Sequence, residues 1–167
     1  DALRFSLIIG NLPGNDIIIS EEKIRGYRNF ANKIWNATRF VLLYVPAVPH
    51  HTKIKYTTAQ NAMRARLAKL VRETTQDLER KRFHHAADRL YHFFWHYYAD
   101  KVIETAKNPL ATPEESVEKA TAQALILEFH TTLMRLLHPF MPFLTEEIWS
   151  YLPSASHNLL MVEPWPQ

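Results

Sequence analysis

The most constraining feature of the sequence is a run of apolar residues at helical spacing that begins after Ser20 and continues to Val45. Ser20 is a suitable N-cap, and the two glutamates that follow it suit the positive N-terminal end of a helix dipole. Pro46 and Pro49 prevent the helix from continuing. The spacing therefore predicts one amphipathic helix over about 21–44. Its inward residues are expected to be Ile24, Tyr27, Phe30, Ala31, Ile34, Trp35, Val41, Leu42 and Val45.

The same period predicts three further long helices. They should run over about 58–80, over 83–107 with a stop at Asn108-Pro109, and over 113–137 with Thr112 as the N-cap. The last of these is apolar around most of its later circumference, which indicates a buried central helix. On the other two, the residues expected to face inward are Ala62, Leu67, Leu70, Val71, Leu78, Phe83, Leu90, Tyr91, Phe94, Tyr97, Tyr98 and Val102.

Shorter elements complete the prediction. Residues 1–12 fit both strand alternation and helical spacing, and helix is preferred; residues 46–57 are expected to form a loop. A last short helix should start at Thr145, and the tail at 159–162 is expected to be a short strand or a loop. The predicted fold is all-α, a helical bundle of four long helices plus short extra helices.

A chain of 167 residues is expected to form a single domain. Within it we expect a lead-in at 1–19, the helical bundle at 20–152 and a C-terminal tail at 153–167. The chain opens on Asp1 in the middle of a pattern, so we interpret it as a piece of a longer protein.

Composition excludes several classes of protein. There is no cysteine, which excludes a disulfide scaffold and thiolate metal sites, and is consistent with a reducing compartment. Three glycines leave no glycine-rich loop of the kind that holds nucleotide phosphates. No apolar run approaches the roughly 18 residues of a membrane span. We therefore expect a cytoplasmic protein with no membrane association.

Charge is unevenly distributed along the chain. Residues 23–72 hold eleven Lys and Arg and no Asp or Glu, whereas the segments before and after them are acidic. Such a block suits a polyanion such as nucleic acid. It equally suits a solvated face that pairs with the acidic helices, and the charge alone leaves both interpretations open.

Histidines are the first candidates for chemistry. Asp88, His92 and His96 follow one another at helical spacing, which raises a metal-dependent bundle enzyme as a hypothesis. Three ligands in line on one helix cannot surround an ion, so a solvated face is preferred. His130 and His138 are interpreted as surface or core-edge residues.

A second anomaly lies on the 21–44 helix, opposite its apolar face. One stripe there holds two amides, a cation and an aromatic ring: Asn29, Lys33, Asn36 and Phe40. Arg39 flanks it. A ring can stack on an unpaired base while amides and cations bind base edges and phosphate. The alternative is that Phe40 packs under another segment, such as the 46–57 loop.

The helix predicted over 83–107 carries one aliphatic residue, Ile103, opposite its aromatic side. A lone exposed aliphatic residue usually has no special role. Ile103 gains significance only if its face meets the Phe40 stripe across a groove.

One stretch is specific enough to indicate a family. Residues 27–42, Tyr-Arg-Asn-Phe-Ala-Asn-Lys-Ile-Trp-Asn-Ala-Thr-Arg-Phe-Val-Leu, closely resemble a motif of valyl-tRNA synthetases. The His-Pro-Phe-Met-Pro-Phe segment at 138–143 is shared with isoleucyl and leucyl relatives, so an isoleucyl-type parent stays an alternative. The resemblance continues at 1–5, 14–17, Trp95, Asp100, Glu104, 136–149 and 161–166.

The resemblance implies a helical domain that grips the anticodon stem and loop of a valine-accepting tRNA. In that family a lysine and a phenylalanine of the motif lie at the anticodon, and they match Lys33 and Phe40. An aliphatic residue on a later helix matches Ile103. The chain departs from the family at 101–102, where aromatic residues are frequent, and at Glu22, where some members have a basic residue.

The resemblance also implies what this chain lacks. The HIGH and KMSKS motifs, the editing insertion and the C-terminal coiled coil are not in it, so we expect no catalysis, with ATP and magnesium acting in a catalytic domain on its N-terminal side. A monomer is expected. The predicted tRNA-binding residues are Asn29, Lys33, Asn36, Arg39, Phe40 and Ile103. A protein-interaction bundle and the metal enzyme are the competing functions.

Overall fold

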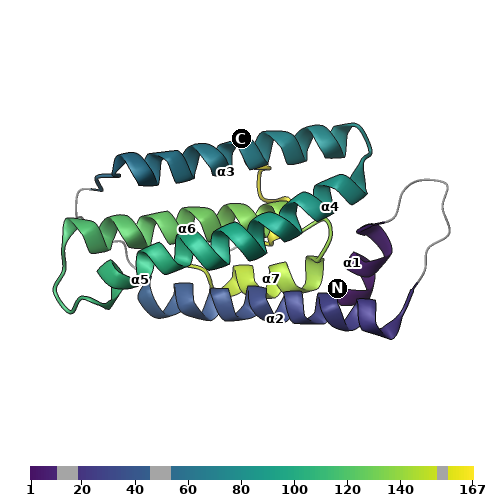
Figure 1. Cartoon of the computed structure of the whole chain (residues 1–167), viewed down its shortest axis with the longest axis horizontal. Coiled ribbons are helices and arrows are strands. Elements are labelled where there is room, and N and C mark those ends of the chain that lie inside the picture. The colour runs from purple at the N-terminus through teal and green to yellow at the C-terminus, as the bar shows by residue number, and fades with distance from the viewer. Residues whose placement is uncertain (11–18, 46–53, 154–157) are drawn as a thin grey trace.

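Helices form all the regular structure in the residues that the computed structural model describes, which are 1–10, 19–45, 54–153 and 158–167 (Figure 1). The all-α prediction is confirmed. The elements are α1 (Ala2–Ile8), α2 (Glu21–Tyr44), α3 (Thr58–Glu79), α4 (Phe83–His92), the π-helix η1 (Phe93–Val102), α5 (Ile103–Ala111), α6 (Val117–Leu137), α7 (Pro142–Tyr151) and the 3-10 turn η2 (Leu160–Val162).

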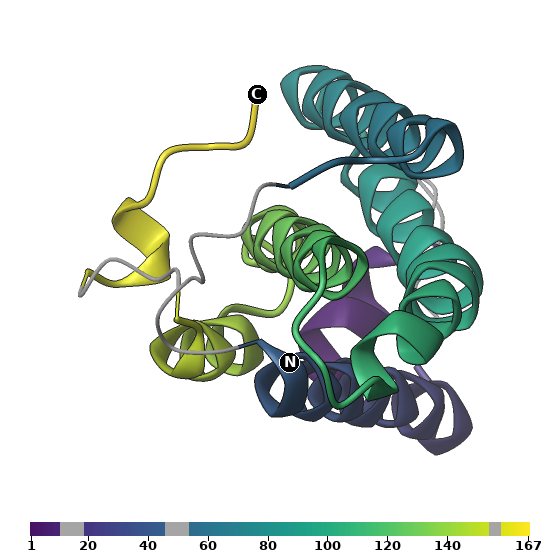
Figure 2. The same ribbon diagram turned by 90° about the vertical axis from the view of Figure 1, so that its left-hand side faces the viewer.

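The α6 helix is the centre of the bundle. Viewed along the bundle, α2, α7, α3 and the continuous α4–η1–α5 rod surround it (Figure 2). Its buried side chains include adjacent pairs, such as Leu125 with Ile126 and Leu133 with Met134, and so extend around much of its circumference. The predicted central helix is confirmed, and its apolar circumference is the reason, since such a helix is stable only when other helices cover it.

The chain's first residues form helix α1, as predicted. Phe5 is fully buried, and its ring packs against those of Tyr27 and Phe30 on α2. The carboxylate of Asp1 accepts a hydrogen bond from the backbone N–H of Leu144 at 2.6 Å. It thereby satisfies an otherwise unpaired donor in the first turn of α7, which ties the two elements together.

Two predicted boundaries around residue 112 are wrong. The rod continues to Ala111 with Pro109 inside its last turn, and α6 begins at Val117. The Thr112 hydroxyl donates backward to the Asn108 carbonyl of the preceding helix. Ser116 makes the N-cap bond instead, accepting from the Lys119 N–H at 3.0 Å. Two capping residues competed here, and their hydrogen bonds decide the boundary.

The last predicted helix starts earlier than expected. Pro142 takes the first turn of α7, where its missing N–H costs nothing. Thr145 is buried and its hydroxyl donates to the Met141 carbonyl at 2.9 Å, so it is not a cap. At 160–162 the tail forms a 3-10 turn, not a strand.

A π-helical segment, η1, changes which side chains of the α4–η1–α5 rod face outward. The Ile103 N–H donates to the Tyr98 carbonyl, five residues earlier, which is the π-helical spacing. A wheel drawn at the α-helical angle therefore fails beyond Phe93. Ile103, predicted to lie on the outer face, is 6% exposed and belongs to the core.

Other predicted orientations are also wrong. Trp35 was expected in the core, but it is 36% exposed, with its ring edge-on to Tyr151 of α7 at 6.2 Å. Ala62 and Phe83, expected to face inward, are exposed. The predicted loop at 46–57 falls largely outside the described residues.

Candidate nucleic-acid interface

The outer face of α2 presents the predicted stripe of Asn29, Lys33, Asn36 and Phe40, called here the α2 stripe. Asn29 and Asn36 are exposed, as is Arg39 beside them. No other helix of the bundle covers these amides in the described structure. Their donors and acceptors are therefore available for base edges or phosphates.

Lys33 connects the α2 stripe to the π-helix. Its ammonium lies 3.4 Å from a carboxylate oxygen of Asp100 and 5.5 Å from the centre of the Trp95 ring. Both side chains of the Lys33–Asp100 pair are more than one third exposed. An exposed pair of this kind contributes at most about 1 kcal/mol, so Lys33 can exchange its partner for an RNA phosphate at small cost.

The sequence allows Phe40 to be either an exposed stacking ring or a ring packed under another segment, and the structure combines features of both. It is partly buried against the core, with its ring centre 5.0 Å from that of Tyr44, yet part of its surface stays accessible. Ile103 does not offer a comparable exposed surface. The structure therefore brings Asn29, Lys33, Asn36, Arg39 and Phe40 to one helix face and places Ile103 beneath the surface.

A buried polar network holds α2 in place from the inside. The Thr38 hydroxyl donates to the Ile34 carbonyl at 3.0 Å and therefore accepts from His130 Nε2 at 2.9 Å. The other ring nitrogen, Nδ1, then accepts from the Tyr98 hydroxyl at 3.0 Å. Three helices, α2, η1 and α6, are joined through one imidazole.

Burial fixes the protonation of this network. It lowers the pKa of His130 to about 3 and raises the pKa of Tyr98 well above its usual value. The imidazole is thus neutral, and each ring nitrogen has one partner. The interpretation of His130 as a surface or core-edge residue is wrong, because it is fully buried.

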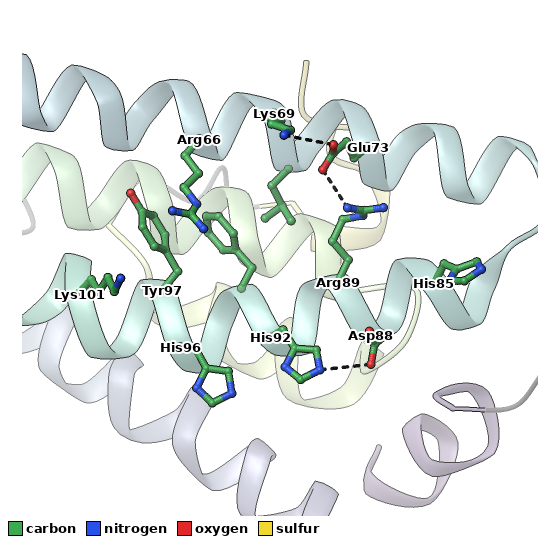
Figure 3. Close-up of a pocket in the computed structure, with 12 residues that line it drawn as sticks. Arg66, Lys69, Glu73, His85, Asp88, Arg89, His92, His96, Tyr97 and Lys101 are labelled. Atoms are coloured by element: carbon green, nitrogen blue, oxygen red, sulfur yellow. Dashed lines mark hydrogen bonds and ion pairs between the residues drawn. The ribbon is translucent and has the colours of Figure 1, made fainter.

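The opposite wall of the rod forms a groove with α3, called here the α3–α4 groove (Figure 3). It encloses about 570 Å³. Arg66, Lys69 and Glu73 enter it from α3, and Arg89, Tyr97 and Lys101 from α4–η1. His85, His92 and His96 lie along the rod side.

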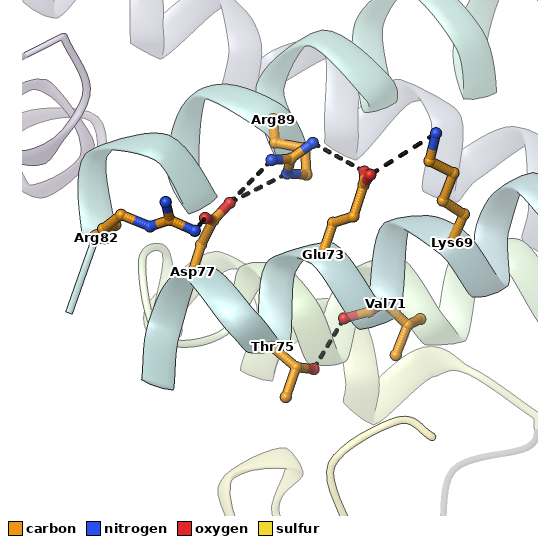
Figure 4. A network of polar contacts seen from close by, with 7 residues as sticks. All are labelled: Lys69, Val71, Glu73, Thr75, Asp77, Arg82 and Arg89. Atoms are coloured by element: carbon orange, nitrogen blue, oxygen red, sulfur yellow. Dashed lines mark hydrogen bonds and ion pairs between the residues drawn. The ribbon is translucent and has the colours of Figure 1, made fainter. Parts of the chain in front are cut away.

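An ion-pair network crosses the α3–α4 groove between its two walls (Figure 4). Arg89 donates to Glu73 at 2.8 Å and to Asp77 at 3.0 Å, and Arg82 pairs with the same Asp77 at 2.6 Å. Lys69 lies 3.7 Å from Glu73. This network joins α3 to α4 across their connecting turn.

The predicted metal hypothesis finds no geometry to support it. His92 lies 3.5 Å from Asp88 and stacks on His96 with ring centres 5.6 Å apart. Within the described ranges, no three His, Asp or Glu side chains gather in a way that would hold an ion. None of the helices there is long and apolar enough to cross a membrane.

Comparison with known proteins decides the family. The family model described as "Anticodon-binding domain of tRNA ligase" matches residues 60–167, well over half of the chain. The chain belongs to this family. The matched range of the anticodon-binding domain covers α3 to the C-terminal tail and leaves α2 to be assessed from whole-chain relatives.

Whole-chain relatives of this anticodon-binding domain are valine–tRNA ligases. Those of Geobacillus kaustophilus and Bacillus subtilis are 41% and 40% identical over 170 and 169 residues, which cover 100% and 99% of this chain. That of Geobacter sulfurreducens is 43% identical over 159 residues, or 93% of the chain. The chain spans about one fifth of the length of these relatives, 18–19%.

Sequence reasoning missed two parts of this anticodon-binding domain. The network of Thr38, Tyr98 and His130 gave no signal, because its members lie on three different helices. The α3–α4 groove was signalled only by the basic block, which did not identify Tyr97 or Lys101 as its opposite wall.

Proposed function

We propose that this domain recognises the anticodon arm of a valine-accepting tRNA as part of a valine–tRNA ligase. The observation that carries the proposal is the identity of about 40% over the whole chain to enzymes of that name. The family match supports tRNA as the partner. The exposed α2 stripe supports the place of contact.

The α2 stripe supplies complementary groups for an unstacked loop. The accessible part of Phe40 offers a stacking surface, Asn29 and Asn36 offer amides for base edges, and Lys33 and Arg39 offer cations for phosphates. Ile103 is included as the apolar support beneath the contact surface, since it lies in the core.

Binding of the valine tRNA, compared with a copy whose anticodon is changed, tests the proposal. Phe40→Ala should weaken binding of the valine tRNA by about 1–3 kcal/mol and reduce discrimination between the two RNAs. Lys33→Ala should weaken binding and lower its salt dependence.

Matched controls lie away from the α2 stripe. Phe143 of α7 is 74% exposed, so Phe143→Ala should leave binding unchanged; Lys23→Ala, in the first turn of α2, is the control for charge. Equal binding of both RNAs by the unaltered domain would contradict anticodon recognition. Preference for an isoleucine tRNA would assign the domain to an isoleucyl-type parent.

The chain by itself is predicted to give no valine-dependent ATP–pyrophosphate exchange, because the motifs for that chemistry are not in its sequence. ATP and magnesium are assigned to a catalytic domain that packs on its N-terminal side. A single domain over 1–167, a monomeric state and a cytoplasmic location complete the proposal.

A further inference from the structure

The α3–α4 groove differs from the α2 stripe in its chemistry. The stripe combines amides and a ring, whereas the groove gathers charges: Arg66, Lys69, Arg89 and Lys101 face two carboxylates, Glu73 and Asp88. The cations exceed the carboxylates even with all histidines neutral. A concave surface with excess positive charge concentrates anions.

The excess charge resides in particular residues. Lys69 and Arg89 both pair with Glu73 and are committed to the network that joins α3 to α4. In the part of the chain that the structure describes, neither Arg66 nor Lys101 pairs with a carboxylate. These two residues lie on opposite walls of the groove, one on α3 and one on η1.

The guanidinium of Arg66 is positioned so that it can bind an anion. Its guanidinium carbon lies 4.2 Å from the centre of the Tyr97 ring. Stacking on a ring restrains the guanidinium and leaves its N–H donors free at the edge, where they match the oxygens of a phosphate. Figure 3 shows Arg66 extending from α3 to meet the Tyr97 ring, which comes from the η1 side of the groove.

The groove and the α2 stripe both border η1. Lys33 of the stripe contacts Trp95 and Asp100 of η1, and the next residues along the chain, His96 and Lys101, line the groove. Only the width of η1, about 10 Å for a helix with its side chains, separates the two surfaces. A nucleic acid on the stripe is therefore within reach of the groove.

We propose that the α3–α4 groove binds the sugar–phosphate backbone of the tRNA whose anticodon loop meets the α2 stripe. Arg66 and Lys101 contact phosphates from the two walls, and the groove holds the RNA without reading its sequence. The inference rests on the proposed function for the identity of the RNA. It assigns a role to the basic block beyond α2 and to the π-helical segment.

The test measures the salt dependence of binding with a valine tRNA transcript as the probe. The double variant Arg66→Gln with Lys101→Gln removes two charges and keeps side-chain length. The slope of log K against log salt should become shallower by about 1.5, the value for two lost phosphate contacts.

The control variant removes the same charge elsewhere. Arg4→Gln with Arg72→Gln alters two exposed residues that do not line the groove. Its slope should change by less than half as much. Equal changes in the two variants would show that RNA responds only to net charge, and would overturn the inference.

A second readout separates this inference from anticodon recognition. The groove variant should weaken binding of the valine tRNA and of its anticodon-changed copy by the same factor, since backbone contacts carry no sequence information. If the unaltered domain binds both RNAs equally, the proposed function fails while the slope test stays readable. If it discriminates but the groove variant leaves the slope unchanged, the inference alone fails.

Displacement of RNA from the groove by polyglutamate at equal charge concentration would assign the groove to an acidic protein instead.

Discussion

Among the polar contacts that join helices in the described residues, two networks use opposite physical devices. The network of Thr38, Tyr98 and His130 is neutral and buried, and each hydrogen bond has one defined donor and acceptor. The network around Arg89 and Asp77 is built from ion pairs whose cations are one third or more exposed. The first excludes water, whereas the second shares its charges with water.

This difference indicates which network holds the α2 stripe in place. A buried polar group left without a partner loses its hydrogen bond and its solvation together, so the His130 network permits one arrangement of α2, η1 and α6. In the second network the pairs of Glu73 are exposed and can rearrange at little cost, whereas Asp77 is nearly buried. The α2 stripe therefore sits on a rigid support, whereas the wall of the α3–α4 groove near Arg89 has interchangeable charges.

Removal of the imidazole should break the buried network with the largest effect. His130→Ala leaves a cavity and the Tyr98 hydroxyl without its closest partner, and should lower the free energy of unfolding by about 3–5 kcal/mol. Urea unfolding measures the change. An effect below that of Arg89→Ala would invert the comparison.

Lowering the pH should have the next largest effect on stability, and it should act on the buried network through His130. The pKa of His130 is about 3 in the folded domain and 6.5 in the unfolded chain. Below pH 6.5 the imidazole of His130 is protonated in the unfolded chain but stays neutral in the folded domain. This contribution to stability is therefore fully present above pH 6.5 and falls by about 1.4 kcal/mol per pH unit towards pH 3.

The matched variant for this prediction is His130→Gln, whose amide can occupy the site without titrating. It should reduce the number of protons taken up on unfolding in acid by about one. Partial burial also lowers the pKa of His138, although Glu146 opposes that shift. His138→Gln should consequently remove less of the pH dependence than His130→Gln; the reverse order would assign the acid sensitivity to the surface of α6.

Loss of Arg89 should have a smaller and salt-dependent effect. Asp77 is nearly buried, with 3% of its side chain exposed, but it keeps Arg82 as a partner. We expect Arg89→Ala to cost about 1–2 kcal/mol, a loss that shrinks in high salt because screening already weakens the pairs. Arg72→Ala, on an exposed face of α3, is the control for lost charge.

The sequence predicted the helices better than it predicted their faces. Periodicity located α2, α3, the α4–η1–α5 rod and α6, because each has a continuous apolar side. The boundary at Thr112 failed because two caps competed within five residues. Ile103 failed because a π-helix changes the rotation per residue, and no local pattern announced it.

The candidate site was predictable in part for the same reason. The α2 stripe follows from helical geometry, and the structure exposes Asn29, Asn36 and Arg39 as expected. The partners of His130 were not predictable, since Thr38 lies 92 residues away in sequence. Long-range pairs of this kind depend on how whole helices pack, which one helix's pattern does not specify.

Within α2 the comparison narrows to two adjacent residues, Ile34 and Trp35. The sequence placed both in the core, but Ile34 is fully buried and Trp35 keeps 36% of its surface exposed. Trp35→Ala removes an edge-on ring contact with Tyr151, and should cost only about 1 kcal/mol. Ile34→Ala should cost about 2–5 kcal/mol, because it leaves a cavity next to the carbonyl that receives the Thr38 hydroxyl. Thermal unfolding of the two variants measures the difference. If Trp35→Ala proved the more destabilising, the outer face of α2 would be a structural contact with α7, and the rigidity of the α2 stripe would come from outside the core.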